Sequence, residues 1–214
     1  AFVYAVIAVD VLLIDAIGTG IEQLIFLVIA GSMIGAIATL FAKQGARVAV
    51  LDVNLDSARA TEASLRAQGG VAEAIACDVG DAAGVASAFE LARRHFDTLD
   101  ILVNNAGIAH VGTLADTTES DFDRLHRVNT KGVFLCAQAA LPTMLAQGGG
   151  VILNMASIAS LIGIEARFAY SMTKGAVLSM TRSIAVDYVN QKIRCNCICP
   201  ARIHTPFVDG FLAK

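Results

Sequence analysis

The sequence predicts an α/β domain built on a doubly wound parallel sheet. Two observations predict this fold. Short apolar runs that end in polar residues alternate along the chain with longer amphipathic segments, and the runs are almost continuous in Val, Ile, Leu and Ala. Strands of a parallel sheet are covered by helices on both faces, so they lose the polar alternation of a half-exposed strand. A chain of 214 residues has room for one such domain with an extension.

The polar ends of the apolar runs and the glycines between them set the bounds of the elements. The run from Arg47 to Leu51 ends at Asp52, and the helical pattern that follows stops at Gly69-Gly70, a pair that terminates helices. We expect strands at 47–52, 71–77, 99–103, 150–155 and 192–198, and helices at 54–68, 81–96, 117–146 and 168–190.

Charge and cysteine content narrow the class of protein. The net charge is −3 and no basic tract is present, which argues against a nucleic-acid partner. The five cysteines form no paired framework, so we expect a reducing compartment, the cytoplasm. Cys195, Cys197 and Cys199 would share one face of a strand, but zinc sites usually need a C-x2-C spacing and a second ligand pair. Small buried thiols are therefore the favoured interpretation, and no metal is predicted.

Tyr170 and Lys174 are the most informative pair in the chain. They lie four residues apart in a segment expected to be helical, thirteen residues after Ser157. Residues i and i+4 share a helix face, so a phenol and an ammonium can converge there. A nearby cation lowers the pKa of a phenol, as an acid/base group working near neutral pH requires. Because many helices contain such a pair without any role, its meaning depends on the residues around it.

Polar groups follow the apolar strands at the positions where a ligand would bind. Asn104-Asn105-Ala106-Gly107 follows one strand, Asn154 and Ser157 close the next, and Asn129 lies in the helix between them. In an open α/β sheet, ligands bind beyond the carboxyl ends of the strands. These side chains are therefore expected to gather at one edge of the sheet.

In this order and spacing, the segments resemble the short-chain dehydrogenase/reductase family. The resemblance runs from about Gly31 to the end of the chain and is close from Phe41 to Thr205. It implies a Rossmann-type fold and a reversible hydride transfer between a nicotinamide cofactor and a small secondary alcohol or ketone.

The resemblance also implies a role for each catalytic residue. Tyr170 would donate or remove the hydroxyl proton, and Ser157 would bind the substrate oxygen. Lys174 would lower the tyrosine pKa and hydrogen-bond the nicotinamide ribose. Asn129 would hold a water molecule that links Lys174 to solvent.

Asp52 decides the expected cofactor. It ends the second strand, 21 residues after Gly31, where a carboxylate accepts both ribose hydroxyls and repels a 2′-phosphate, so NAD is expected rather than NADP. The full set of expected cofactor contacts, by resemblance, is Gly31, Ser32, Ile34 and Gly35 at the phosphate turn; Asp78 and Val79 at the adenine; Asn104, Ala106 and Gly107 along the cofactor; Tyr170 and Lys174 at the nicotinamide ribose; and Pro200, Ile203 and Thr205 beyond it.

The phosphate turn departs from the family pattern. Family members carry Thr-Gly-x-x-x-Gly-x-Gly there, whereas this chain has Gly31 and Gly35, with Ile29 and Met33 where glycines are expected. Side chains at these positions would project toward the pyrophosphate or strain the turn. The alternative function is therefore a catalytically silent relative that acts as a binding or scaffold protein.

The two ends of the chain are atypical as well. We expect residues 1–23 to be an apolar extension and residues 24–214 to be the catalytic domain, without the family's last helix and strand. Residues 24–42 are apolar, free of charge and long enough to span a bilayer, but they coincide with a strand, turn and helix that the fold needs. No basic flank precedes them. No membrane span is expected; a membrane-anchored enzyme, or a stretch that is not the natural sequence, stays open as an alternative.

A homodimer or homotetramer is the expected assembly. The helices near 129–146 and 170–189 are rich in small and apolar residues, and related enzymes pair these helices across a two-fold axis. The residues expected to form this second face are Val133, Ala137, Ala140, Ala176, Val177, Met180 and Ile184.

Overall fold

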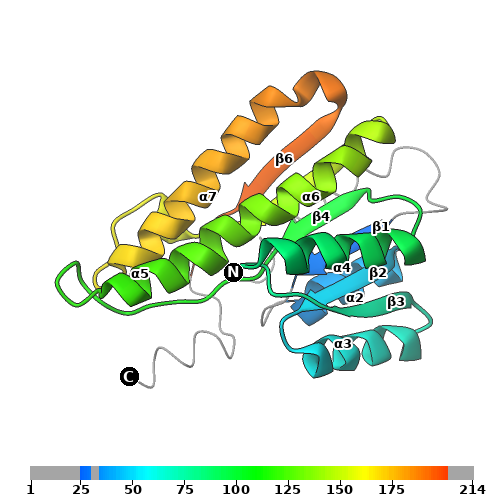
Figure 1. Cartoon of the computed structure of the whole chain (residues 1–214), viewed down its shortest axis with the longest axis horizontal. Coiled ribbons are helices and arrows are strands. Elements are labelled where there is room, and N and C mark those ends of the chain that lie inside the picture. The colour runs from blue at the N-terminus through cyan, green and yellow to red at the C-terminus, as the bar shows by residue number, and fades with distance from the viewer. Residues whose placement is uncertain (1–24, 30–33, 202–214) are drawn as a thin grey trace.

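The computed structural model describes residues 25–29 and 34–201, which form a parallel sheet between two layers of helices (Figure 1). The six strands lie in the order β3-β2-β1-β4-β5-β6, and each neighbouring pair is parallel. The predicted doubly wound α/β fold is thus confirmed. The strands are β1 (Ile25–Ile29), β2 (Arg47–Asp52), β3 (Val71–Ala76), β4 (Ile101–Asn104), β5 (Gly150–Met155) and β6 (Ile193–Ile198).

The helices cover the sheet on both faces. α2 and α3 pack on one face, and α4, α6 and α7 pack on the other (Figure 1). The helices are α2 (Ile34–Lys43), α3 (Leu55–Ala67), α4 (Ala82–His95), α5 (Glu119–Leu125), α6 (Gly132–Ala146) and α7 (Phe168–Asp187). A π-helical turn, η1 (His126–Lys131), joins α5 to α6, and two 3₁₀ turns, η2 (Ile158–Ser160) and η3 (Val189–Gln191), flank α7.

Side-chain caps explain where several helices begin and end. The Oδ1 of Asn54 accepts hydrogen bonds from two backbone N–H groups of the first turn of α3. Asp81 and Thr118 cap α4 and α5 in the same way. These caps satisfy backbone donors that have no partner within the helix. After α3 the chain reverses at Gly69, whose φ of +83° favours glycine.

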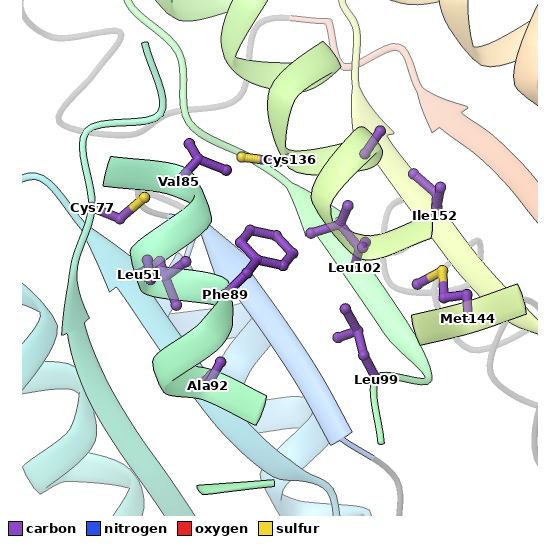
Figure 2. Close-up of a cluster of buried hydrophobic side chains, with 14 of the residues drawn as sticks. Leu51, Cys77, Val85, Phe89, Ala92, Leu99, Leu102, Cys136, Met144 and Ile152 are labelled. Atoms are coloured by element: carbon purple, nitrogen blue, oxygen red, sulfur yellow. The ribbon is translucent and has the colours of Figure 1, made fainter. Parts of the chain in front are cut away.

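The sheet separates the two larger clusters of the hydrophobic core. Ala49 and Leu51 of β2 face α4 and α6, whereas Val48 and Val50 of the same strand face α2 and α3. Figure 2 shows the larger cluster, in which Phe89 of α4 lies centrally above the strands. A strand that contributes to both clusters has no polar face, which is why its sequence reads as one apolar run.

The described parts of the stretch considered as a possible membrane span belong to the sheet and its helices. Residues 25–29 form β1, which pairs with β2 on one side and β4 on the other, and residues 34–43 form α2. Within the described parts of the chain, no helix has both the length and the apolar composition needed to cross a membrane.

The expected second face of the two long helices is not free. Val133 and Val177 belong to one buried cluster, and Ala137 and Ala140 belong to the larger one. The prediction that these four residues form an exposed interface is therefore wrong, because they pack within the chain. Ala176, Met180 and Ile184 are partly buried. Homo-oligomerisation itself stays a prediction.

The strand order places a topological switch point between β1 and β4. β1 and β4 are neighbours, with β2 and β3 on one side and β5 and β6 on the other, so the order of the strands reverses between them. Ligands of doubly wound proteins bind outside such a switch point. Asn104 pairs with Ile29 across it and with Asn154 on its other side, so the polar strand ends lie along one edge.

Candidate active site

Ser157 lies close enough to Tyr170 to lower the pKa of its phenol. Ser157 follows β5 and caps η2, where its Oγ accepts a hydrogen bond of 3.1 Å from the N–H of Ala159. Tyr170 lies in the first turn of α7. The start of that helix is fixed by Gly112, which exchanges backbone hydrogen bonds with Ala166 and Phe168. Loop and helix thus position the two hydroxyls independently.

Lys174 lies one helical turn after Tyr170 and is only 6% exposed. Its Nζ donates a hydrogen bond of 2.6 Å to the carbonyl oxygen of Met155 and lies 5.9 Å from the centroid of the Tyr170 ring. A Cβ atom at Gly107 would lie 3.5 Å from both this Nζ and the Oδ1 of Asn129. The structure thus brings together all four residues expected to be catalytic.

Burial controls the titration of the tyrosine and the lysine. It raises the pKa of Tyr170 above its usual value, while the hydrogen bond with Ser157 and the charge of Arg167 oppose this rise. Burial also lowers the pKa of Lys174 to about 8. The expectation that Lys174 lowers the tyrosine pKa stays a prediction. The charge of Arg167 acts on the phenol, and the ammonium of Lys174 lies near the same ring while bound to the carbonyl of Met155.

Asn129 lies in the π-helical turn η1 and is fully buried. Its Oδ1 accepts a hydrogen bond from the N–H of Ile108, and its Nδ2 donates to the carbonyl oxygen of Ile108, both at 2.8 Å. Nδ2 also lies 3.1 Å from the Oγ1 of Thr173, the residue before Lys174. π-turns are rare in helices and often occur at functional sites. This turn ties the loop after β4 to α7 through one amide.

We expect Asn129→Leu to lower the free energy of unfolding by about 3 kcal/mol, because it leaves the N–H and C=O of Ile108 without partners. Urea denaturation measures the change. The matched control is Thr130→Val. The Oγ1 of Thr130 is buried and has no hydrogen-bond partner among the described residues, so this variant should be no less stable than the parent. Equal losses in the two variants would contradict the role assigned to the amide.

Asn104 ends β4 and is buried. It is 3% exposed, and its Nδ2 donates a hydrogen bond of 2.8 Å to the Oδ1 of Asn154. Asn154 in turn donates to the Oγ1 of Thr181 on α7. Among the described residues, nothing donates to the Oδ1 of Asn104. Asn104 thus joins β4 to β5, and through Asn154 to α7.

Two carboxylates end the strands on the other side of the switch point. The Oδ1 of Asp52, after β2, accepts a hydrogen bond of 2.8 Å from the N–H of Asn54. Asp78, after β3, accepts one from the N–H of Gly80 at 2.9 Å and one from Arg127 at 2.8 Å. The hydrogen bond from Arg127 is the main cause that lowers the pKa of Asp78.

Three polar contacts of the site were missed from the sequence. They are the pairing of Arg127 with Asp78, the bond between Asn129 and Thr173, and the Arg167 charge near Tyr170. The partners of the first two are more than 40 residues apart, and no local pattern marks them.

Gly31, Ser32, Ile203 and Thr205 lie outside the described residues, whereas Ile34 and Gly35 begin α2. The remaining expected contacts lie at the carboxyl edge. Val79 is buried, Ala106 and Gly107 follow β4, and the carbonyl oxygen of Pro200 accepts a hydrogen bond of 2.9 Å from the N–H of Ile158, beside Ser157.

The three alternating cysteines, two in β6 and Cys199 just after it, pack against apolar clusters. Cys195 belongs to the main core, and Cys197 and Cys199 pack against a small cluster that contains Val177. In the part of the chain that the structure describes, no three His, Cys, Asp or Glu side chains converge as metal ligands would.

Comparison with known proteins identifies the family. The family model described as enoyl-(acyl carrier protein) reductase matches residues 29–214. The 2-(R)-hydroxypropyl-CoM dehydrogenase of Xanthobacter autotrophicus is 43% identical over 178 residues, which are 81% of this chain and 71% of that protein.

Solved structures agree with this match. A short-chain dehydrogenase/reductase from Burkholderia xenovorans is 33% identical, with a TM-score of 0.84 over 89% of this chain and 78% of its own. An NAD⁺-bound xylitol dehydrogenase is 32% identical, with a TM-score of 0.84 over 86% of this chain and 72% of its own. Matched in sequence and fold over most of its length, this chain belongs to the short-chain dehydrogenase/reductase family of oxidoreductases.

Proposed function

We propose that this protein is an NAD-dependent oxidoreductase that interconverts a secondary alcohol and a ketone. The observation that carries the proposal is the grouping of three side chains: Ser157 lies beside Tyr170, and the buried ammonium of Lys174, one turn further along the same helix, lies 5.9 Å from the centroid of the tyrosine ring. Such a group can bind one substrate oxygen and move one proton to or from it.

Tyr170 is the proton donor and acceptor in this proposal. In the direction of reduction, the phenol gives its proton to the carbonyl oxygen while Ser157 donates a second hydrogen bond to the same atom. A tyrosine whose pKa is raised by burial stays protonated at neutral pH, which suits this step. In the direction of oxidation the phenolate must take the proton, so we infer that oxidation is favoured as the pH rises.

The N–H groups of the Lys174 ammonium that have no acceptor among the described residues could donate to a cofactor. An ammonium has three N–H groups, and among the described residues only the carbonyl of Met155 accepts from it. A buried ammonium with unpaired donors is costly, and ribose hydroxyls can accept them. The nicotinamide group, when bound, takes up or supplies the hydride.

The remaining cofactor would extend along the carboxyl edge of the sheet. Asp52 would accept hydrogen bonds from the adenosine ribose, Asp78 and Val79 would hold the adenine, and Ala106 and Gly107 would line the middle. The likeness to the NAD⁺-bound xylitol dehydrogenase supports this arrangement. By the family resemblance, Gly31, Ser32, Ile34 and Gly35 would bind the phosphates.

The first experiment is a substrate screen. Polyols, sugar acids, steroids and 3-oxoacyl thioesters are incubated with the protein and NAD or NADH, and the absorbance of the reduced cofactor is followed. We expect turnover of at least one secondary alcohol or ketone. If no compound reacts and calorimetry detects no binding of NAD or NADP, the proposal is rejected.

We expect NAD to be used at least about tenfold more efficiently than NADP, because the Asp52 carboxylate accepts ribose hydroxyls and repels a 2′-phosphate. The variant Asp52→Ser should lower kcat/KM for NAD about tenfold and raise it for NADP. The control is Asp56→Ser, whose carboxylate is 92% exposed in the first turn of α3, and it should not change the preference. A parent that binds NADP more tightly than NAD would refute the assignment of Asp52.

A further inference from the structure

Arg127 connects the adenine end of the proposed site to the turn that holds Asn129. It lies in η1, two residues before Asn129, and its Nη1 donates a hydrogen bond of 2.8 Å to the Oδ2 of Asp78 in the loop after β3. The partners are 49 residues apart in the sequence. None of the roles proposed above uses this arginine.

The arginine side chain lies directly over Gly80. A Cβ atom built on Gly80 would be 2.6 Å from Nη1, 2.8 Å from Cγ and 3.0 Å from Cζ of Arg127. These distances are far shorter than ordinary contacts between side chains. The absence of a side chain at Gly80 therefore lets the guanidinium reach Asp78. The other carboxylate oxygen of Asp78 is held by the N–H of Gly80, so both oxygens are fixed.

A second contact joins the same loop to the opposite side of Asn129. A Cβ atom at Gly132, the first residue of α6, would lie 2.7 Å from Cγ2 of Val79. The loop from Asp78 to Gly80 thus packs on the residues that flank Asn129 on both sides. A displacement of this loop would therefore also displace the turn that carries the buried Asn129 amide.

The Arg127–Asp78 pair contributes little to stability. The side chain of Arg127 is 48% exposed and that of Asp78 is 38% exposed. Ion pairs with this exposure usually stabilise a protein by less than about 1 kcal/mol, because water and salt screen them. A function in binding would explain why both carboxylate oxygens are nevertheless held in one orientation.

We propose that Arg127 is a positioning residue that orients the Asp78 carboxylate toward the adenine of the cofactor and fixes the adenine-binding loop to the Asn129 turn. This inference rests on the proposed function, because it assumes a dinucleotide at the carboxyl edge. A carboxylate already held by two donors loses less freedom when it accepts a third from the exocyclic amine of adenine. Arg127 acts through Asp78 and takes no part in hydride transfer.

The test separates the adenine half of the cofactor from the nicotinamide half. Calorimetry measures the affinities of NAD, AMP and nicotinamide mononucleotide for the parent and for Arg127→Ala. We expect the variant to bind NAD and AMP about fivefold more weakly, and nicotinamide mononucleotide as the parent does. The kcat at saturating NAD and the melting temperature should stay close to those of the parent. Arg127→Lys should restore part of the loss.

The matched control is Arg124→Ala. Arg124 lies one turn earlier and is also 48% exposed, but it pairs with Asp121 instead of Asp78. It should leave the affinities for all three ligands unchanged.

A double-mutant cycle tests the contact with Gly80. Gly80→Ala alone should weaken AMP binding as Arg127→Ala does, because its methyl group would displace the guanidinium. In the Arg127→Ala background it should add little, since the three atoms closest to the new methyl group all belong to Arg127. Full additivity would contradict the contact.

The outcomes distinguish this inference from the function on which it rests. A parent that binds neither NAD nor AMP rejects the proposed function and, with it, the role of Arg127. A parent that binds both, together with an Arg127→Ala variant of equal affinity for AMP, rejects this role alone. An equal loss for AMP and nicotinamide mononucleotide also rejects it, since it would indicate a general disturbance of the site.

Discussion

Tyr170→Phe is expected to lower kcat in both directions by at least about a thousandfold, while the fold and the affinity for NAD are retained. The change removes the phenolic oxygen that would exchange a proton with the substrate, and general acid–base groups commonly contribute factors of this size. The ring itself still packs in the same place, so its burial is unchanged. Steady-state kinetics, calorimetric titration with NAD and thermal unfolding measure the three quantities.

The same substitution at another tyrosine is the control. Tyr188 follows the end of α7 and packs against the main core, so Tyr188→Phe removes a hydroxyl of the same chemistry far along the helix. It should leave kcat within about twofold of the parent. A Tyr170→Phe variant that kept most of its rate would show that another group transfers the proton.

Lys174→Met is expected to lose activity and to gain stability at neutral pH. The pKa of Lys174 is about 8 in the folded protein against 10.5 for an ordinary lysine. A difference of this size means that the buried charge costs about 3 kcal/mol at neutral pH. Methionine removes this cost but leaves the carbonyl of Met155 without its partner, which offsets about 1–3 kcal/mol. We therefore expect a variant as stable as the parent or more so.

The pH dependence of the difference in stability between Lys174→Met and the parent identifies the cause of that difference. Between about pH 8 and pH 10.5 the native protein has released the lysine proton while the unfolded chain still binds it, so the stability of the parent rises with pH in this window. Below about pH 8 both states bind the proton, and this contribution is constant. Urea denaturation at several pH values should show that the advantage of Lys174→Met shrinks by about 3 kcal/mol across the window. A difference that stays constant, or grows, would contradict the burial of a charged lysine.

The elements of the fold were predictable because their signals are local. The apolar run that ends in Asp52 predicted β2 at the residues where it lies. The glycines after α3 predicted the end of that helix. The spacing of Ser157, Tyr170 and Lys174 marked the site for a similar reason, since four residues along a helix fix a direction in space.

What failed in the prediction depends on contacts between distant segments. A π-turn shifts the helix by one residue without changing its apolar pattern, so the turn at Asn129 has no sequence signal. A helix rich in alanine has apolar residues on every side, so its sequence does not show which side packs within the chain. For this reason Val133 and Ala137 were wrongly predicted to lie on an exposed face. The pKa of Tyr170 follows from its depth in the folded chain, and sequence spacing gives only its distance from Lys174.

The transfer of hydrogen itself tests the central claim most directly. NADH that carries deuterium at the transferable position of the nicotinamide ring is incubated with the protein and the best ketone from the screen, and the alcohol is analysed by mass spectrometry and NMR. We expect deuterium on the carbinol carbon with the parent and none with Tyr170→Phe, since both should bind the cofactor but only the parent can protonate the oxygen. An alcohol whose new carbon-bound hydrogen comes from water, or one formed equally fast by Tyr170→Phe, would contradict the proposed function.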